Sequence, residues 1–245
     1  MPLMAYLETL RKSLIVAGGT WFVAFVALYG FAEELFSWIA LPMRSALPSG
    51  SSMVFVEATE PFFTYLMLAA VAALAVSLPV ILWQVWSLIT TGQSSKRKGL
   101  GFLFILGGCS SFFGGAYLGF AYVLPVIFSF LINFGTESGT VAAMLSMGEY
   151  LSLALKMMLA FGLVFELPVI MTVLARVGLA DRLWFASKRK YMLILAFVFG
   201  ALVTPGPDVV SQCSIAIPFV ILYEVGILGA WLCQKHRAAA VGEKA

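Results

Sequence analysis

Two glutamates stand alone within apolar segments, and they are the residues of this chain best suited to chemistry. Glu166 lies in FGLVFELPVI, with no charged residue within nine positions on either side. Counting along a helix places Glu166 ~15 Å from Arg176 and Glu224 ~16 Å from Lys235, near the middle of a bilayer. An acid at that depth costs about 2.5–3.5 kcal/mol on insertion scales and usually has a function.

Two carboxylates at one depth predict a shared polar cavity or a pair that holds a proton. The alternative for each is a structural, protonated acid that is hydrogen-bonded to a neighbouring helix. Lys156 precedes Glu166 by ten residues and lies ~15 Å further out, too far to pair with it. Gln84, in LPVILWQVW, is either a further polar group of such a cavity or an interhelical hydrogen-bond partner.

The remaining polar residues do not form a recognisable catalytic or metal site. The single histidine, His236, lies in the C-terminal tail, and no Walker A, HExxH or G-x-S-x-G motif occurs. Cys109, Cys213 and Cys233 lack CxxC spacing and are typical of small buried residues. We therefore expect a protein that is not an enzyme and that needs neither metal nor cofactor.

The composition indicates a membrane protein. Hydrophobic residues make up 62% of the 245 residues and charged residues 11%, with a mean hydropathy of +1.00, whereas soluble domains contain about 25% charged residues. A spanning helix needs about 20 apolar residues. We expect a single all-α membrane domain over 1–245, with a tail at 235–245 and six spans at about 13–32, 61–89, 100–132, 150–175, 190–204 and 211–233.

The fifth of these spans is short, so it crosses only where the bilayer thins or the helix stops part way. A cleaved signal peptide is the alternative for the first span, but its 20-residue apolar run exceeds the ~7–15 residues typical of such peptides. Prolines within several spans predict bent helices and hence a curved, cup-shaped bundle. They are Pro79, Pro125, Pro168 and Pro218.

Basic residues predict the orientation of the bundle. If both termini are cytoplasmic, thirteen Lys and Arg residues lie in the inner segments, and only Arg44 lies in an outer one. This asymmetry is a strong positive-inside signal. The net charge of +3 therefore reflects topology, and we expect no nucleic-acid partner.

The outer segments predict a cap over the bundle. FAEELFSWIALPM, in the segment 33–60, has apolar residues at helical spacing, and LPSGSS then breaks the pattern. We expect a short interfacial helix followed by a turn and an extended return; a mobile loop is the alternative. Asp208, in the outer turn TPGPDVV, is placed to cap the last helix.

Several motifs together resemble the TatC family, the polytopic core subunits of the twin-arginine protein translocase. The likeness runs in register from about residue 3 to residue 234. Its most specific parts are FGLVFELPV and the TPGPDVVSQ turn. The other motifs are YLETLRKSL, EPFFTYL, LPVILWQVWSLI and AIPFVILYE.

The resemblance implies a cupped bundle in the bacterial inner membrane, with both termini inside. It implies that Glu166 engages TatA- and TatB-type single-span partners in a homo- and hetero-oligomer, and that folded cargo crosses by means of the proton-motive force. Pro42 and Pro48 match the outer cap of the family, and Asp208 and Gln212 match its last outer turn.

The inner face of such proteins binds the Arg-Arg pair of signal peptides, and here this sequence departs from the family. Thr9 occupies a position where the family usually has an acid, although Glu8 precedes it, and Arg97 stands near the second expected acid. Carboxylates are the strong partners of guanidinium groups, so recognition is expected to be altered unless Glu8 substitutes. The predicted binding residues are Glu8, Thr9, Leu10, Arg11, Gln84 and Arg97.

Two other functions remain open from the sequence. A proton-coupled small-molecule carrier would use Glu166 and Glu224, although carriers usually show internal repeats, and no matching halves occur here. A divergent scaffold with altered signal recognition would keep the bundle, and the missing inner-face acids favour it.

Overall fold

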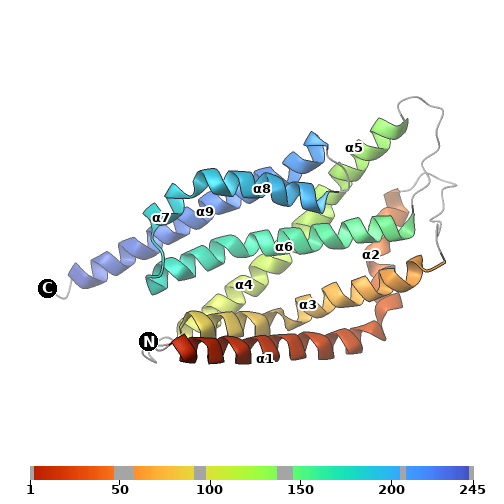
Figure 1. Cartoon of the computed structure of the whole chain (residues 1–245). Helices are drawn as coiled ribbons and strands as arrows, with labels where there is room; N and C mark the ends of the chain where they lie inside the picture. Colours follow the sequence, from red (N-terminus) through yellow and green to blue (C-terminus); the bar gives the residue numbers. More distant parts are fainter. Residues whose placement is uncertain (1–2, 47–57, 91–97, 137–145, 205–207, 243–245) are drawn as a thin grey trace.

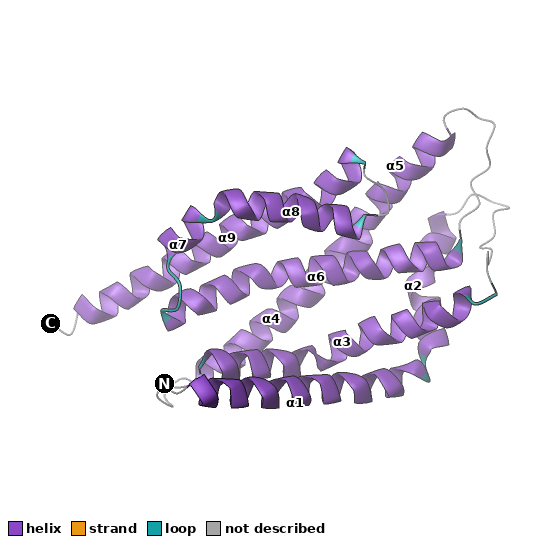
Figure 2. Cartoon of the chain, in the orientation of Figure 1, coloured by secondary structure: helices purple, strands orange, loops and turns teal. Residues whose placement is uncertain are grey.

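The computed structural model describes residues 3–46, 58–90, 98–136, 146–204 and 208–242, and the regular elements in these ranges are helices (Figure 2). The all-α prediction is therefore confirmed. The helices are α1 (Leu3–Tyr29), α2 (Ala32–Ala46), α3 (Glu60–Ile89), α4 (Lys98–Leu118), the π-helical η1 (Gly119–Val123), α5 (Leu124–Thr136), α6 (Met147–Val177), α7 (Arg182–Ser187), α8 (Arg189–Val203) and α9 (Val209–Gly242).

Local signals in the sequence set the ends of the central helix, α6. At its start, the Ser146 hydroxyl accepts a hydrogen bond from the Glu149 backbone N–H at 3.3 Å, which satisfies one of the free donors of the first turn. At its end, Gly178 adopts a left-handed conformation with φ 88°, which glycine tolerates without steric cost. Asp181 then caps α7 by accepting from the Trp184 N–H at 2.6 Å.

A proline explains the π-helical segment between α4 and α5. Pro125 has no N–H, so the carbonyl of Ala121 loses its usual partner. The chain widens locally, and the Leu124 N–H bonds instead to the carbonyl of Gly119. α4, η1 and α5 thus form one continuous helical rod that crosses behind α6 in Figure 1.

α6 lies at the centre of the bundle and packs against α3, α4 and α9. α1 packs on α3 at one side of the molecule, and α8 packs on α9 at the other (Figure 1). The largest fully buried side chain, Phe161 of α6, lies in a cluster with Ile127 of α5 and Ile215 of α9. The position of α6 is important because it carries Glu166.

The predicted outer helix is present as α2. Its Phe36 and Ala40 are buried against Leu68 of α3 and Leu151 of α6, whereas Trp38 is exposed. α2 therefore covers one end of two long helices, the end predicted to be outer. Pro42 lies within α2, while Pro48, the turn and the extended return lie outside the described residues.

Five of the described helical segments are long and apolar enough to cross a membrane, whereas we expected six spans. The exception is α8, whose 15 residues extend ~22 Å, less than the ~30 Å hydrocarbon core of a bilayer. The five are 7–29, 60–89, 101–130, 148–177 and 209–234.

We predict that Gly115→Ala separates α4 from α6 and destabilises the bundle. A Cβ atom at Gly115 would lie 2.6 Å from the Phe161 carbonyl oxygen, a backbone atom that yields only if the helices move apart. We expect a loss of roughly 1–3 kcal/mol, measured by unfolding in detergent. Gly114→Ala is the matched control, because a Cβ atom there meets no atom within 4 Å. Equal stability of the two variants would contradict the prediction.

Candidate functional site

Glu166 lies on the face of α6 that is turned toward α3 and α4, and it is only 5% exposed. The absence of a side chain at Gly108 of α4 makes room for it. A Cβ atom at Gly108 would lie 3.1 Å from Glu166 Oε2 and 2.6 Å from Leu82 Cδ1 of α3. Next to it in the chain, the Phe165 carbonyl accepts a hydrogen bond from the Ser111 hydroxyl of α4 at 2.6 Å, which fixes this turn of α6.

The carboxylate of Glu166 has no hydrogen-bond partner among the described residues at either oxygen. The sequence predicted a polar cavity around Glu166, whereas in this arrangement the side chain is buried between α6 and the packed helices α3 and α4. The sequence places an acid at a given depth but does not show how tightly neighbouring helices pack around it. The result is a buried, unsatisfied acceptor, a costly feature that requires explanation.

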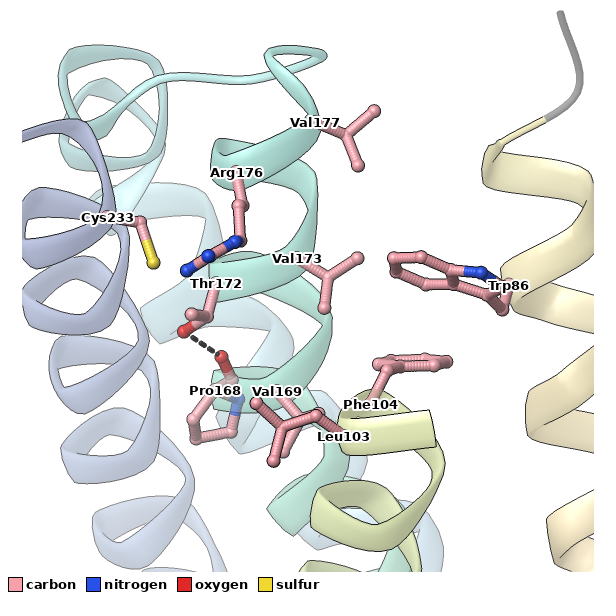
Figure 3. A pocket seen from close by; sticks show the side chains of 10 residues that line it. All are labelled: Trp86, Leu103, Phe104, Pro168, Val169, Thr172, Val173, Arg176, Val177 and Cys233. Atoms are coloured by element: carbon pink, nitrogen blue, oxygen red, sulfur yellow. Dashed lines mark hydrogen bonds between the residues drawn. The ribbon is translucent and has the colours of Figure 1, made fainter. Parts of the chain in front are cut away.

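An open pocket of about 300 Å³ begins one helical turn further along α6, at Pro168 and Val169 (Figure 3). α3 and α4 contribute Trp86 and Phe104 to it, and α9 contributes Cys233. Glu166 does not belong to its lining. This pocket is therefore mostly apolar, and the acid is not part of its wall.

The prediction that Glu224 shares a polar cavity with Glu166 is wrong. Arg189 donates two hydrogen bonds to the Glu224 carboxylate, from Nε to Oε1 and from Nη2 to Oε2, each at 2.7 Å. Counting along α9 alone missed this partner, because α8 begins beside the middle of α9, which continues past it (Figure 1). Glu224 is thus one half of an interhelical ion pair that joins α8 to α9.

Among the residues predicted to form the inner face, Glu8 makes a contact within α1, and Gln84 makes one between α3 and α1. Glu8 forms an ion pair with Lys12 at 3.0 Å, and both side chains are largely exposed. The Ser13 hydroxyl lies 3.2 Å from Gln84 Oε1 and donates to it, so the interhelical alternative for Gln84 is confirmed. Thr9 and Leu10 are half-buried and Arg11 is exposed, whereas Arg97 lies outside the described residues.

The last outer turn holds α9 against α8. Asp208 accepts a hydrogen bond from the Ser211 N–H at 2.7 Å, so the predicted cap is confirmed. The side-chain amide of Gln212 donates to the Phe197 carbonyl of α8 at 2.8 Å. Asp208 therefore caps the start of α9, and Gln212 joins α9 to α8.

Sequence reasoning missed one contact at the outer end. The carboxylate of Glu60, at the start of α3, accepts hydrogen bonds from the Ser146 hydroxyl and the Gly148 N–H at the start of α6. An anion is favoured at a helix N-terminus. The signal available in the sequence was an acid immediately before Pro61, at the beginning of a long apolar run.

The fold and site define a polytopic helical membrane protein with a buried acid at its centre. Residues 5–218 match the model of the family described as TatC, Sec-independent protein translocase protein. The chain belongs to the TatC family.

Relatives and solved structures agree with this assignment. The chain is 37% identical to the Sec-independent protein translocase protein TatC of Desulforapulum autotrophicum, over 96% of this chain and 86% of that protein. It is 34% identical to the TatC protein of Escherichia coli K12, over 92% of this chain and 86% of the relative. A crystal structure of the twin-arginine translocase receptor TatC matches with a TM-score of 0.84 and 31% identity, covering 94% of this chain and 99% of that one.

We predict that Arg189→Glu and Glu224→Arg each lower the melting temperature of the protein, because each places two like charges side by side. The double variant restores the pair in reverse and should recover most of the loss. Thermal unfolding of the four proteins in detergent forms a double-mutant cycle. Strictly additive losses would show that the two side chains do not stabilise each other.

Proposed function

We propose that this chain is the signal-binding core subunit of a twin-arginine translocase. It binds Arg-Arg signal peptides at its inner face and acts with TatA- and TatB-type single-span partners. Folded proteins then cross the bacterial inner membrane, driven by the proton-motive force. The observation that carries this proposal is the in-register match to the family over residues 5–218, which includes the buried Glu166 of α6.

The proposed topology has six crossings and both termini in the cytoplasm. Five long helices and the distribution of thirteen basic residues against one support it. α8 completes the even number of crossings if the bilayer thins around it, which costs fractions of a kcal/mol per Å of mismatch. A curved, cup-shaped bundle would present its hollow side to the partner helices.

The enclosed carboxylate of Glu166 provides the point of engagement with a partner. Its two oxygens are acceptors without donors among the described residues, and burying a polar group without a hydrogen bond is unfavourable. A polar group on a single-span partner would remove that cost by donating to Glu166 when α3 and α4 part from α6. The carboxylate thus favours the partner-bound state over a fully closed bundle.

The alternative functions are affected differently by the contacts. A proton-coupled carrier relied on Glu166 and Glu224 sharing a path, and the pairing of Glu224 with Arg189 removes that basis. A divergent subunit with altered signal recognition keeps a specific observation in its favour: the half-buried Thr9 stands where the family usually has an acid.

We predict that Glu166→Ala abolishes or severely reduces export while the protein remains folded and inserted, because the acceptor for the partner is lost. Export of a folded reporter is measured in bacteria that lack their own TatC protein and produce this chain together with its TatA- and TatB-type partners. Glu33→Ala, an exposed acid of α2, is the control and should export normally. Unchanged export by the Glu166 variant would reject the assigned role.

We predict that Glu8 binds the signal peptide in place of the missing acid at Thr9, and that Lys12 competes with the peptide for the Glu8 carboxylate. Glu8→Gln should weaken crosslinking of a twin-arginine peptide to the inner face about tenfold or more, since a hydrogen bond to a charged group contributes about 1.5–3 kcal/mol. Lys12→Gln should strengthen it by releasing the carboxylate from the observed pair. A Lys-Lys peptide is the control ligand. Strong peptide binding that does not depend on Glu8 would refute the proposal that Glu8 takes the role of the missing acid.

A further inference from the structure

The open pocket beside α6 combines apolar walls with one cation. Its volume is about 300 Å³, at the lower end of the range for ligand sites. Trp86 and Phe104 face Val169 and Val173 across it, as Figure 3 shows. Trp86 and Phe104 also contact each other, with ring centroids 5.6 Å apart. This wall suits a hydrocarbon chain.

Arg176 supplies the positive charge of the pocket. Its side chain extends into the space between α6 and α9, toward Cys233 (Figure 3). It forms no ion pair with a carboxylate of the described ranges. The nearby Thr172 hydroxyl is already engaged, because it donates to the Pro168 carbonyl at 2.6 Å. A planar guanidinium that lacks an anion is well suited to bind a phosphate.

Neighbouring residues indicate that this end of the bundle lies at the level of lipid headgroups. Arg182 lies over the ring of Trp231, with 5.9 Å to its centroid. Lys188 lies 5.6 Å and Lys190 5.1 Å from the ring centroid of Tyr191. Aromatic rings beside basic residues are typical of the membrane–water interface. Arg176, in the last turn of α6, therefore lies near that boundary.

We infer that this pocket binds one anionic phospholipid, with its phosphate at Arg176 and an acyl chain against the apolar wall of Val173 and Trp86. The charge of Arg176 selects against the Arg-Arg segment of a signal peptide, although the apolar wall alone would accept a peptide. Basic residues at this boundary attract anionic lipids. The inference does not depend on the proposed export function, because it concerns only a lipid bound to the folded chain.

The test uses the full chain in nanodiscs that contain phosphatidylglycerol and phosphatidylcholine, followed by native mass spectrometry of the lipid retained in detergent. The wild type should retain one phosphatidylglycerol. Arg176→Gln should retain about fivefold less, as expected for one basic group, and Arg176→Lys should retain most of it. Lys190→Gln removes one charge outside the pocket and is the matched control, expected to behave like the wild type. Val173→Trp fills the pocket and should exclude the lipid.

Alkylation of Cys233 provides a second measurement, because this thiol lines the pocket. Phosphatidylglycerol should slow its modification in the wild type but not in Arg176→Gln, with the labelled site identified by peptide mass spectrometry. Equal lipid retention by Arg176→Gln and Lys190→Gln would overturn the inference. So would protection of Cys233 by a twin-arginine peptide but not by phosphatidylglycerol, which would make the pocket a peptide site.

Discussion

The close approach of α4 to α6 is the constraint on which the rest of the bundle depends. Within a bilayer, apolar side chains gain little by leaving lipid for protein, so helices associate through tight packing. Gly115 and Gly119 permit that packing, since Cβ atoms there would lie 2.6 and 2.9 Å from the carbonyl oxygens of Phe161 and Met157. The same contact brings Gly108 against Glu166 and encloses the acid. The burial of this carboxylate is therefore a consequence of glycine positions on another helix.

The two isolated glutamates show how neighbouring helices decide the role of a residue in a membrane. Glu224 meets Arg189 and becomes a structural link between α8 and α9. Glu166 lies against Gly108 of α4, and both of its carboxylate oxygens lack a hydrogen-bond donor among the described residues. A paired acid is a stabilising contact, whereas an unpaired one favours any partner that can donate to it. Of the two, Glu166 is the acid that we propose to engage a partner helix.

The sequence predicted the parts of this structure that depend on one segment at a time. Apolar runs located the long helices, the proline positions indicated irregular turns, and Asp208 was recognised as a cap. Contacts between segments were predicted poorly. The Arg189–Glu224 pair depends on where α8 begins relative to α9, and the enclosure of Glu166 depends on the α4 contact. Neither relation is encoded in spacing along a single helix.

The π-helical turn at η1 changes the helical phase of the rod that contains it. One extra residue in a turn rotates everything beyond it by about 100° relative to an uninterrupted α-helix. Before η1, Gly108 and Gly115 of the rod lie against α6; beyond it, Leu124 and Ile127 are buried with both Phe161 of α6 and Ile215 of α9. The rod therefore keeps its contact with α6 and adds a contact with α9 beyond η1. Pro125 sets the position of this change in phase, and so decides where along the rod the contact with α9 begins.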